Sequence, residues 1–136
     1  MPSTEVIFYA ERGACPFLSW VQEQQQKVQD KILDAVLRLE ELGYELRRPE
    51  AEYLRDDIYE LRIKKGHVNY RPLYFFDDAK DPRTGRTIRR AVVAHGCVKE
   101  GSVDPRDIDL AIARRKAYRA DRLAHSYVDP EDGGNE

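Results

Sequence analysis

Two arginines on neighbouring predicted strands have the clearest chemical potential in this sequence. Arg62 lies in an alternating polar and apolar stretch, and Arg71 lies in the next β-prone stretch. A guanidinium on a strand can hold a phosphate through two parallel hydrogen bonds. Lys64 shares a face with Arg62 because side chains alternate along a strand, so it can extend a phosphate-binding patch. The alternatives are an ion pair of Arg62 with Glu60 or a cross-strand acid, and a solvated Lys64.

A histidine and two tyrosines are further candidates on the same predicted strands. His95 can titrate near neutral pH and could therefore move a proton. It shares a strand face with Val93, so a histidine at the edge of the core is the alternative. Tyr70 and Tyr74 could stack on RNA bases, although aromatic strand residues commonly belong to the core.

A polar loop between two predicted strands carries a dense group of cations. Within eleven residues it holds Lys80, Arg83, Arg86, Arg89 and Arg90. Such a cluster can follow the phosphate backbone of an RNA. A solvated loop that only improves solubility is the alternative.

The apolar pattern predicts four strands and three helices that would position these residues. We expect strands at 6–10, 58–64, 68–76 and 88–98, and helices at 16–21, 28–42 and from residue 105 onward. Gly43 is suited to end the second helix. Asp104 and Pro105 are suited to cap and begin the third. Pro72 cannot donate a ladder hydrogen bond, so it predicts a sheet edge or a bulge there.

The order of these elements predicts an α+β domain. Three consecutive strands joined by short or moderate loops favour a small antiparallel sheet, with an N-terminal helical hairpin packed on it and a C-terminal helix. We expect the helices on one face and an irregular linker at 46–52. The domain should span 1–123, and 124–136 should form an acidic, disordered tail.

Charge is distributed unevenly along the 136 residues. The net charge of the chain is −2, but residues 47–116 contain 17 lysines and arginines against 12 acids. The remaining residues carry 6 basic and 13 acidic side chains. Because local charge steers a polyanion to its site, the basic middle of the chain is compatible with RNA binding. No apolar run is long enough to span a bilayer, which favours a cytoplasmic protein without a membrane partner.

The residue types that usually bind metals do not occur here in the usual spacings. The sequence contains no HExxH motif, no paired Cys/His ligand spacing and no dense carboxylate cluster. We therefore expect no metal and no cofactor. Cys15 and Cys97 show no CxxC spacing, which favours two reduced thiols.

Three stretches, taken in order, resemble one family of proteins. Residues 54–62 read LRDDIYELR, residues 69–76 read NYRPLYFF, and residues 95–100 read HGCVKE. The third is followed by Pro105, Asp107, Ile108, Ala111 and Tyr118. Together they resemble the RelE/ParE superfamily of toxin–antitoxin toxins, in its HigB-like, phage-associated branch. The resemblance covers most of the chain from 17 to 118.

This resemblance implies a ribosome-dependent endoribonuclease that cuts messenger RNA during translation, with the 2′-hydroxyl of the RNA as nucleophile and without a metal. The implied partners are the ribosome, the messenger RNA and a helix-turn-helix antitoxin, through which alone a small oligomer would form. Lys99 matches the basic position of the family. The predicted catalytic residues are Arg62, Arg71, Lys99 and His95. The predicted RNA-binding residues are Lys64, Arg83, Arg86, Arg89 and Arg90.

The sequence departs from the family pattern at three residues, in a longer loop at 77–87 and in an extra acidic tail. Cys97 replaces an aromatic residue, Glu100 replaces a second lysine, and Pro72 replaces a β-branched residue. Two other functions therefore stay open. One is a ParE-like inhibitor of DNA gyrase that acts by protein contact. The other is an inactive, phage-derived interaction protein.

Overall fold

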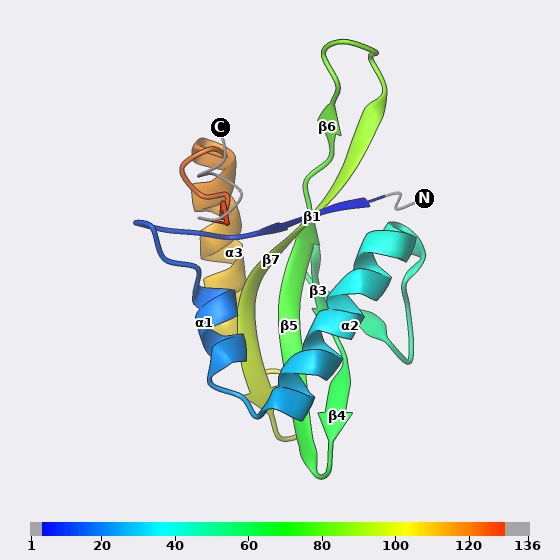
Figure 1. The fold of residues 1–136 in the computed structure, drawn as a ribbon, viewed down its shortest axis with the longest axis vertical. Helices are drawn as coiled ribbons and strands as arrows, with labels where there is room; N and C mark the ends of the chain where they lie inside the picture. The colour runs from blue at the N-terminus through cyan, green and yellow to red at the C-terminus, as the bar shows by residue number, and fades with distance from the viewer. Residues whose placement is uncertain (1–3, 130–136) are drawn as a thin grey trace.

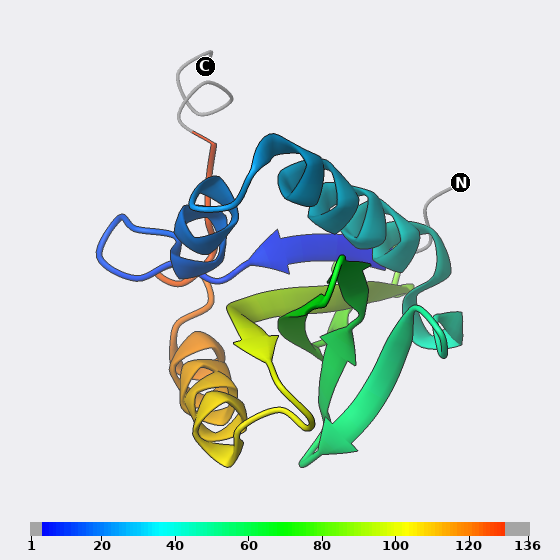
Figure 2. The same cartoon turned by 90° about the horizontal axis from the view of Figure 1, so that it is seen from below.

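The computed structural model describes residues 4–129, which form a twisted sheet with helices packed on it (Figures 1 and 2). The fold is α+β, as predicted. The elements in chain order are β1 (Thr4–Phe8), α1 (Pro16–Gln22), α2 (Gln26–Leu42), η1 (Gly43–Glu45), β2 (Ala51–Arg55), β3 (Ile58–Leu61), β4 (Ile63–Lys65), β5 (Val68–Phe76), β6 (Ala79–Lys80), β7 (Thr87–Lys99) and α3 (Pro105–Ala120).

The sheet is mixed. Its main strand order is β1-β7-β5-β3-β2, while β4 pairs with β5 and β6 pairs with β7. All these pairs are antiparallel, as expected, except that β1 runs parallel to β7. The two helices and several strands that separate β1 from β7 in the chain provide the long connection that a parallel pair requires.

The helices cover both faces of the sheet, so the expectation that they share one face was wrong. The core on the side of α1 and α2 includes Phe17, Ile32 and Tyr74, whereas the core on the side of α3 includes Leu73 and Tyr118. Consecutive residues of β5 and β7 are therefore buried on opposite faces. An uninterrupted apolar run in a strand is typical of burial on both sides.

The predicted strand at 58–64 is divided into β3 and β4 at Arg62. The Arg62 N–H donates to the Glu50 carbonyl at 2.9 Å. The pairing register with β5 is unchanged across this break, since Glu60 lies opposite Leu73 before it and Ile63 lies opposite Tyr70 after it. Pro72 thus lies opposite the interruption, in a central strand rather than an edge strand, and the pairing of β5 with β7 shifts register just after it, between Leu73 and Tyr74, as the predicted bulge alternative requires. The structure also contains β2, at the end of a segment predicted to be an irregular linker.

Two glycines allow close contacts with side chains from distant segments. Gly43 ends α2 with a φ of 51°, and a Cβ built there would lie 2.1 Å from Thr4 Oγ1. A Cβ on Gly96 of β7 would lie 2.1 Å from the indole Cε3 of Trp20. Each position therefore requires the absence of a side chain. The predicted end of α2 is confirmed.

The chain continues in an ordered path beyond α3, as a single strand-like segment beside β1. Ala10 N–H donates to the His125 carbonyl at 2.9 Å, and Tyr127 N–H donates to the Phe8 carbonyl at 2.9 Å. The His125 ring stacks on Tyr9 at 5.1 Å. Part of the segment predicted to be a disordered tail is therefore packed on the domain. The rest of it, 130–136, lies outside the described residues.

None of the helices described between residues 4 and 129 is both long and apolar enough to cross a membrane.

Candidate functional site

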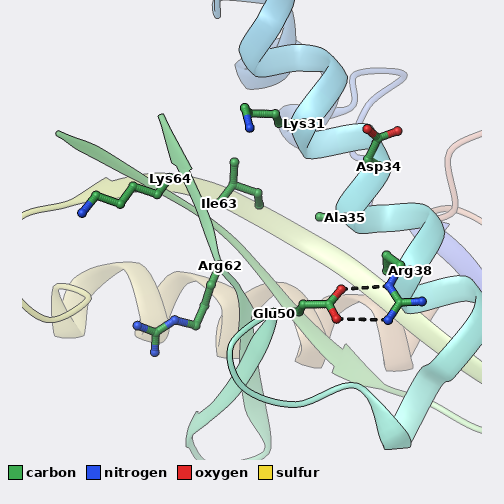
Figure 3. Close-up of a pocket in the computed structure, with 8 residues that line it drawn as sticks. All are labelled: Lys31, Asp34, Ala35, Arg38, Glu50, Arg62, Ile63 and Lys64. Carbon is green, nitrogen blue, oxygen red and sulfur yellow. Dashed lines mark hydrogen bonds and ion pairs between the residues drawn. The ribbon is translucent and has the colours of Figure 1, made fainter. Parts of the chain in front are cut away.

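The sheet brings all four predicted catalytic residues and Lys64 onto the face that carries α3. Lys64 lies opposite Asn69, which lies opposite Lys99, and Arg71 lies opposite Cys97. Directly opposed residues point to the same side of a sheet. Figure 3 shows Arg62 and Lys64 pointing away from α2, whereas Ile63 between them points toward it. We call Arg62, Lys64, Arg71, His95 and Lys99 the basic face.

The outermost row of the basic face consists of Lys64 and Lys99 on either side of Asn69. Lys64 is exposed and Lys99 is half-buried. Among residues 4–129, neither lysine forms an ion pair. Strands lie about 4.8 Å apart, so the two lysines leave the sheet about 10 Å apart and their long side chains can converge on one anion. This row presents uncompensated positive charge.

Arg71 in the next row is inside the protein. It is 3 % exposed, and its Nη1 donates to the carbonyls of Ile63 at 3.3 Å and Tyr70 at 3.0 Å. Its Nε lies 3.3 Å from a carboxylate oxygen of Glu60, which is 1 % exposed. This is an ion pair without hydrogen-bond geometry. Burial lowers the pKa of Arg71, and Glu60 opposes that effect. The guanidinium therefore contacts protein groups rather than solvent.

Arg62 lies between this buried pair and solvent. Its side chain is 30 % exposed, and its Nη1 donates to Glu52 at 2.8 Å and lies 3.6 Å from Glu60. Both acids considered as partners from the sequence, Glu60 and a cross-strand acid, contact Arg62. The guanidinium is thus oriented by two carboxylates while part of it stays accessible.

His95 connects the basic face to α3. Its Nε2 lies 2.7 Å from Asp107 Oδ1, and its Nδ1 lies 3.3 Å from Arg114 Nη1. Arginine can only donate, so Nδ1 accepts and the Nε2–H donates to Asp107. Arg114 also donates to the Ala94 carbonyl at 2.7 Å. His95 is therefore held in one tautomer by two residues of the helix.

Cys97 lies beside this histidine and is buried. Its thiol donates to the Arg71 carbonyl at 3.5 Å, and burial raises its pKa to about 12. One donor atom each from His95, Cys97 and Asp107 lie within 4.8 Å of one another. A metal on Nε2 would force the ring proton onto Nδ1, which faces Arg114, so these residues fit a hydrogen-bonded cluster better than a metal centre. Cys15 is also a free, buried thiol, as expected.

A hollow of about 310 Å³ adjoins the basic face at the edge of the sheet, between α2 and β4 (Figure 3). Arg38 and Glu50 form a two-pronged ion pair across it, with distances of 2.9 and 3.0 Å. Arg62 and Lys64 of the basic face also line it, together with Lys31, Asp34, Ala35 and Ile63. Because acids and bases are mixed there, the hollow lacks the single sign of charge that would attract an anion.

The predicted RNA-binding loop lies far from the basic face. Lys80 pairs with Thr87 at the start of β7, and Lys99 lies at the end of that strand. Twelve strand residues correspond to about 40 Å. Arg90 points inward and contacts Glu5 at 3.4 Å and Asp77 at 3.8 Å. The structure thus separates Lys64 from the loop cations grouped with it in the sequence prediction.

Sequence reasoning named Glu60 and a cross-strand acid as partners of Arg62, but it missed the partners of Arg71 and His95. Glu60 was considered only as an ion-pair partner of Arg62 and not as the partner of Arg71. Asp107 was noted as part of the family pattern, and neither Asp107 nor Arg114 was expected to contact His95. Asp107 lies twelve residues from His95 and Arg114 lies nineteen, so no local pattern could have identified these contacts.

The family comparison agrees with this architecture. Residues 19–116, from α1 to α3, match the model of the family described as phage-derived protein Gp49-like (DUF891). No curated protein matches the sequence. Since the matched region includes the whole basic face and covers well over half of the chain, the chain belongs to the phage-derived Gp49-like family, a family of RelE-like, toxin-type proteins.

Proposed function

We propose that this protein is the toxin of a type II toxin–antitoxin module and that its basic face cleaves messenger RNA during translation. Family membership supports a toxin-type protein, and the fold is consistent with a small RelE-like domain. The observation that carries the proposed chemistry is the row of lysines, Lys64 and Lys99, which form no ion pair within residues 4–129 and lie beside the oriented Arg62. A scissile phosphate bound over Asn69 would meet cations from β4, from β7 and from the break between β3 and β4.

The proposed reaction requires charge stabilisation more than a dedicated nucleophile. The 2′-oxygen of the RNA bonds to the adjacent phosphorus, the bond from phosphorus to the 5′-oxygen breaks, and a cyclic phosphate remains. The proton of the 2′-hydroxyl is lost to solvent and the leaving 5′-oxygen gains one. Negative charge grows on the phosphate oxygens, and Lys64, Lys99 and the exposed part of Arg62 stabilise it.

Arg71 and His95 act from behind this surface in our proposal. The Arg71–Glu60 pair anchors the centre of the face, and Arg62 is oriented through its contact with the same Glu60. His95 fixes the first turn of α3 against β7 through Asp107. Both are therefore positioning residues, which refines the catalytic roles expected from the sequence. We propose a helix-turn-helix antitoxin as the inhibiting partner in the cytoplasm.

A coupled translation reaction with mapping of message ends tests this proposal. The wild-type protein should produce cuts that follow the codon period of the translated message. The double variant Lys64→Gln/Lys99→Gln should reduce the cutting rate at least about 100-fold, since it removes two charge-stabilising groups. Lys65→Gln is the matched control, because Lys65 is exposed on the same strand but points to the other face.

Two outcomes would overturn the proposal. One is an intact message in the presence of folded wild-type protein, and inhibition of gyrase supercoiling in the same preparation would then support the ParE-like alternative. The other is equal loss of cutting in Lys65→Gln and in the double variant, which would mean that general charge rather than the basic face is responsible.

A further inference from the structure

We propose that the hairpin between β5 and β7 is a second RNA-binding surface, which holds an RNA phosphate backbone far from the cleavage site. We call residues 78–89 the arm. In Figure 1 the arm rises beyond β1 and the helices, at the opposite end of the sheet from β4. The inference rests on the proposed function, since it assigns the arm to the same RNA-directed activity.

The acids of the arm are all engaged in holding its structure. Asp81 accepts from the Arg83 N–H at 2.8 Å, and its own N–H donates to the Arg86 carbonyl at 2.9 Å. Asp78 accepts from the Tyr44 hydroxyl at 3.0 Å and from the Arg90 N–H at 3.2 Å. These carboxylates satisfy backbone groups and a tyrosine, so they do not pair with the cationic side chains of the arm.

The cations of the arm are consequently left free. Lys80, Arg83 and Arg86 are exposed, and none of them forms an ion pair within residues 4–129. Elsewhere most arginines are paired with acids, as Arg38 is with Glu50 and Arg55 with Asp109. Three unpaired cations on one projecting hairpin are therefore a departure from the pattern of the rest of the protein.

An aromatic stack at the base of the arm fixes a fourth cation. The Arg89 guanidinium lies 4.6 Å from the centre of the Tyr44 ring, and that ring stacks on Phe76 at 3.9 Å. Stacking uses the flat face of a guanidinium and leaves its N–H edges available for phosphate oxygens. Arg89 is thus preoriented, which lowers the entropy that a phosphate contact would cost.

Arginine predominates among these groups, which favours phosphate as the ligand. A guanidinium matches two phosphate oxygens with parallel hydrogen bonds, and contacts of this kind bind RNA without reading its sequence. Because the arm and the basic face are about 40 Å apart, they cannot hold the same nucleotide. The arm therefore binds backbone that lies away from the scissile phosphate, either in the same message or in ribosomal RNA.

The test compares a variant of the arm with a variant of equal charge. Lys80→Gln/Arg83→Gln/Arg86→Gln removes the free cations of the tip. Arg12→Gln/Lys27→Gln/Lys116→Gln removes three exposed cations from other surfaces. Each protein is titrated with a short RNA duplex, with an oligouridine strand and with ribosomes free of message, at several salt concentrations.

The arm variant should bind at least one of these probes 10-fold or more weakly than the control variant. The slope of log affinity against log salt should be smaller in magnitude by about two for the arm variant. Each phosphate contact to a single strand contributes roughly 0.7 to this slope, and three cations are removed. A loss seen with ribosomes and the duplex would assign the arm to ribosomal RNA. A loss confined to oligouridine would assign it to the message.

Equal affinities of the two variants for all three probes would overturn the inference. This result is distinguishable from failure of the proposed function, because binding is measured without cleavage. If wild-type protein cuts message and the arm variant binds as the control does, the function stands and the arm has no RNA role. If the arm contributes to binding but no message is cut, the arm has an RNA role and the proposed cleavage activity fails.

Discussion

The basic face and the arm both carry positive charge, but their acids are used differently. On the basic face, Glu52 and Glu60 pair with Arg62 and Arg71 and leave two lysines free. On the arm, Asp78 and Asp81 bind backbone and tyrosine groups and leave arginines free. The first arrangement fixes side chains inside a packed surface. The second fixes a backbone shape and leaves the side chains of Lys80, Arg83 and Arg86 exposed to solvent.

This difference indicates that the position of the acids decides which cations can bind a ligand. Counting lysines and arginines along the sequence treats both regions alike. The structure separates charge that holds the fold together from charge that remains for a partner. Structural charges and free charges should therefore differ in how much their substitution changes the free energy of unfolding.

Substitution of Glu60 should cause the largest change. Glu60→Gln leaves the Arg71 guanidinium buried without an opposing charge, and the loss of one partner of a buried ion pair typically costs about 3–5 kcal/mol of stability. Urea unfolding measures this. Glu52→Gln is the control, because Glu52 is 28 % exposed and should cost less than about 1 kcal/mol. Similar losses in the two variants would contradict the assignment of Glu60 as the internal partner.

Substitution of Asp77 should cause an intermediate change that depends on pH. Asp77 is buried and contacts Arg122 at 2.8 Å, Arg119 at 3.3 Å and Arg90 at 3.8 Å. Asp77→Asn should cost about 2 kcal/mol at neutral pH, through loss of charge-assisted hydrogen bonds. Urea unfolding at several pH values measures both the loss and its pH dependence.

The sign of the pH effect follows from the pKa of Asp77. The hydrogen bond from Arg122 holds this pKa below its usual value of 3.8, so the charged form is favoured in the folded state. The stabilisation is present above the pKa of the unfolded chain and is lost as the pH falls through the lower folded-state pKa. The wild type and Asp77→Asn should therefore approach each other in stability under acid conditions. A gap that stays constant down to about pH 2 would contradict this account.

Substitution of the arm cations should cause the smallest change. Lys80→Gln/Arg83→Gln/Arg86→Gln removes exposed side chains that have no ion pair among the described residues, so the free energy of unfolding should change by less than about 0.5 kcal/mol per position. Thermal unfolding beside the control variant measures this. A marked loss of stability would mean that these cations hold the hairpin together and are not reserved for a ligand.

The sequence predicted the local features of the fold well and the contacts between distant segments poorly. The apolar stripe at 28–42 identified α2, and the run 91–94 identified the buried centre of β7. Strand β2 was not predicted, because its sequence is polar and irregular. It forms because β3 offers an open edge. The segment after α3 looks like an acidic tail, yet it packs where β1 leaves backbone groups unpaired.

The same distinction applies to the candidate site. Alternation along the strand was enough to place Lys64 with Arg62 on one face. It could not show that Arg71 is buried, since its burial depends on Glu60, eleven residues earlier, and on Cys97 in another strand. The sequence also could not show the contacts of His95, whose two partners come from a helix that follows it.

The contact between Trp20 and Gly96 has a practical consequence. Trp20 is the one tryptophan of the chain, and its indole lies directly on β7, on the side of the sheet opposite Arg71 and Cys97. Its fluorescence emission therefore comes from a single place, one backbone thickness behind the basic face. The unmodified protein thus carries an optical reporter for events on that strand, and ligand titrations can be followed without attaching a dye.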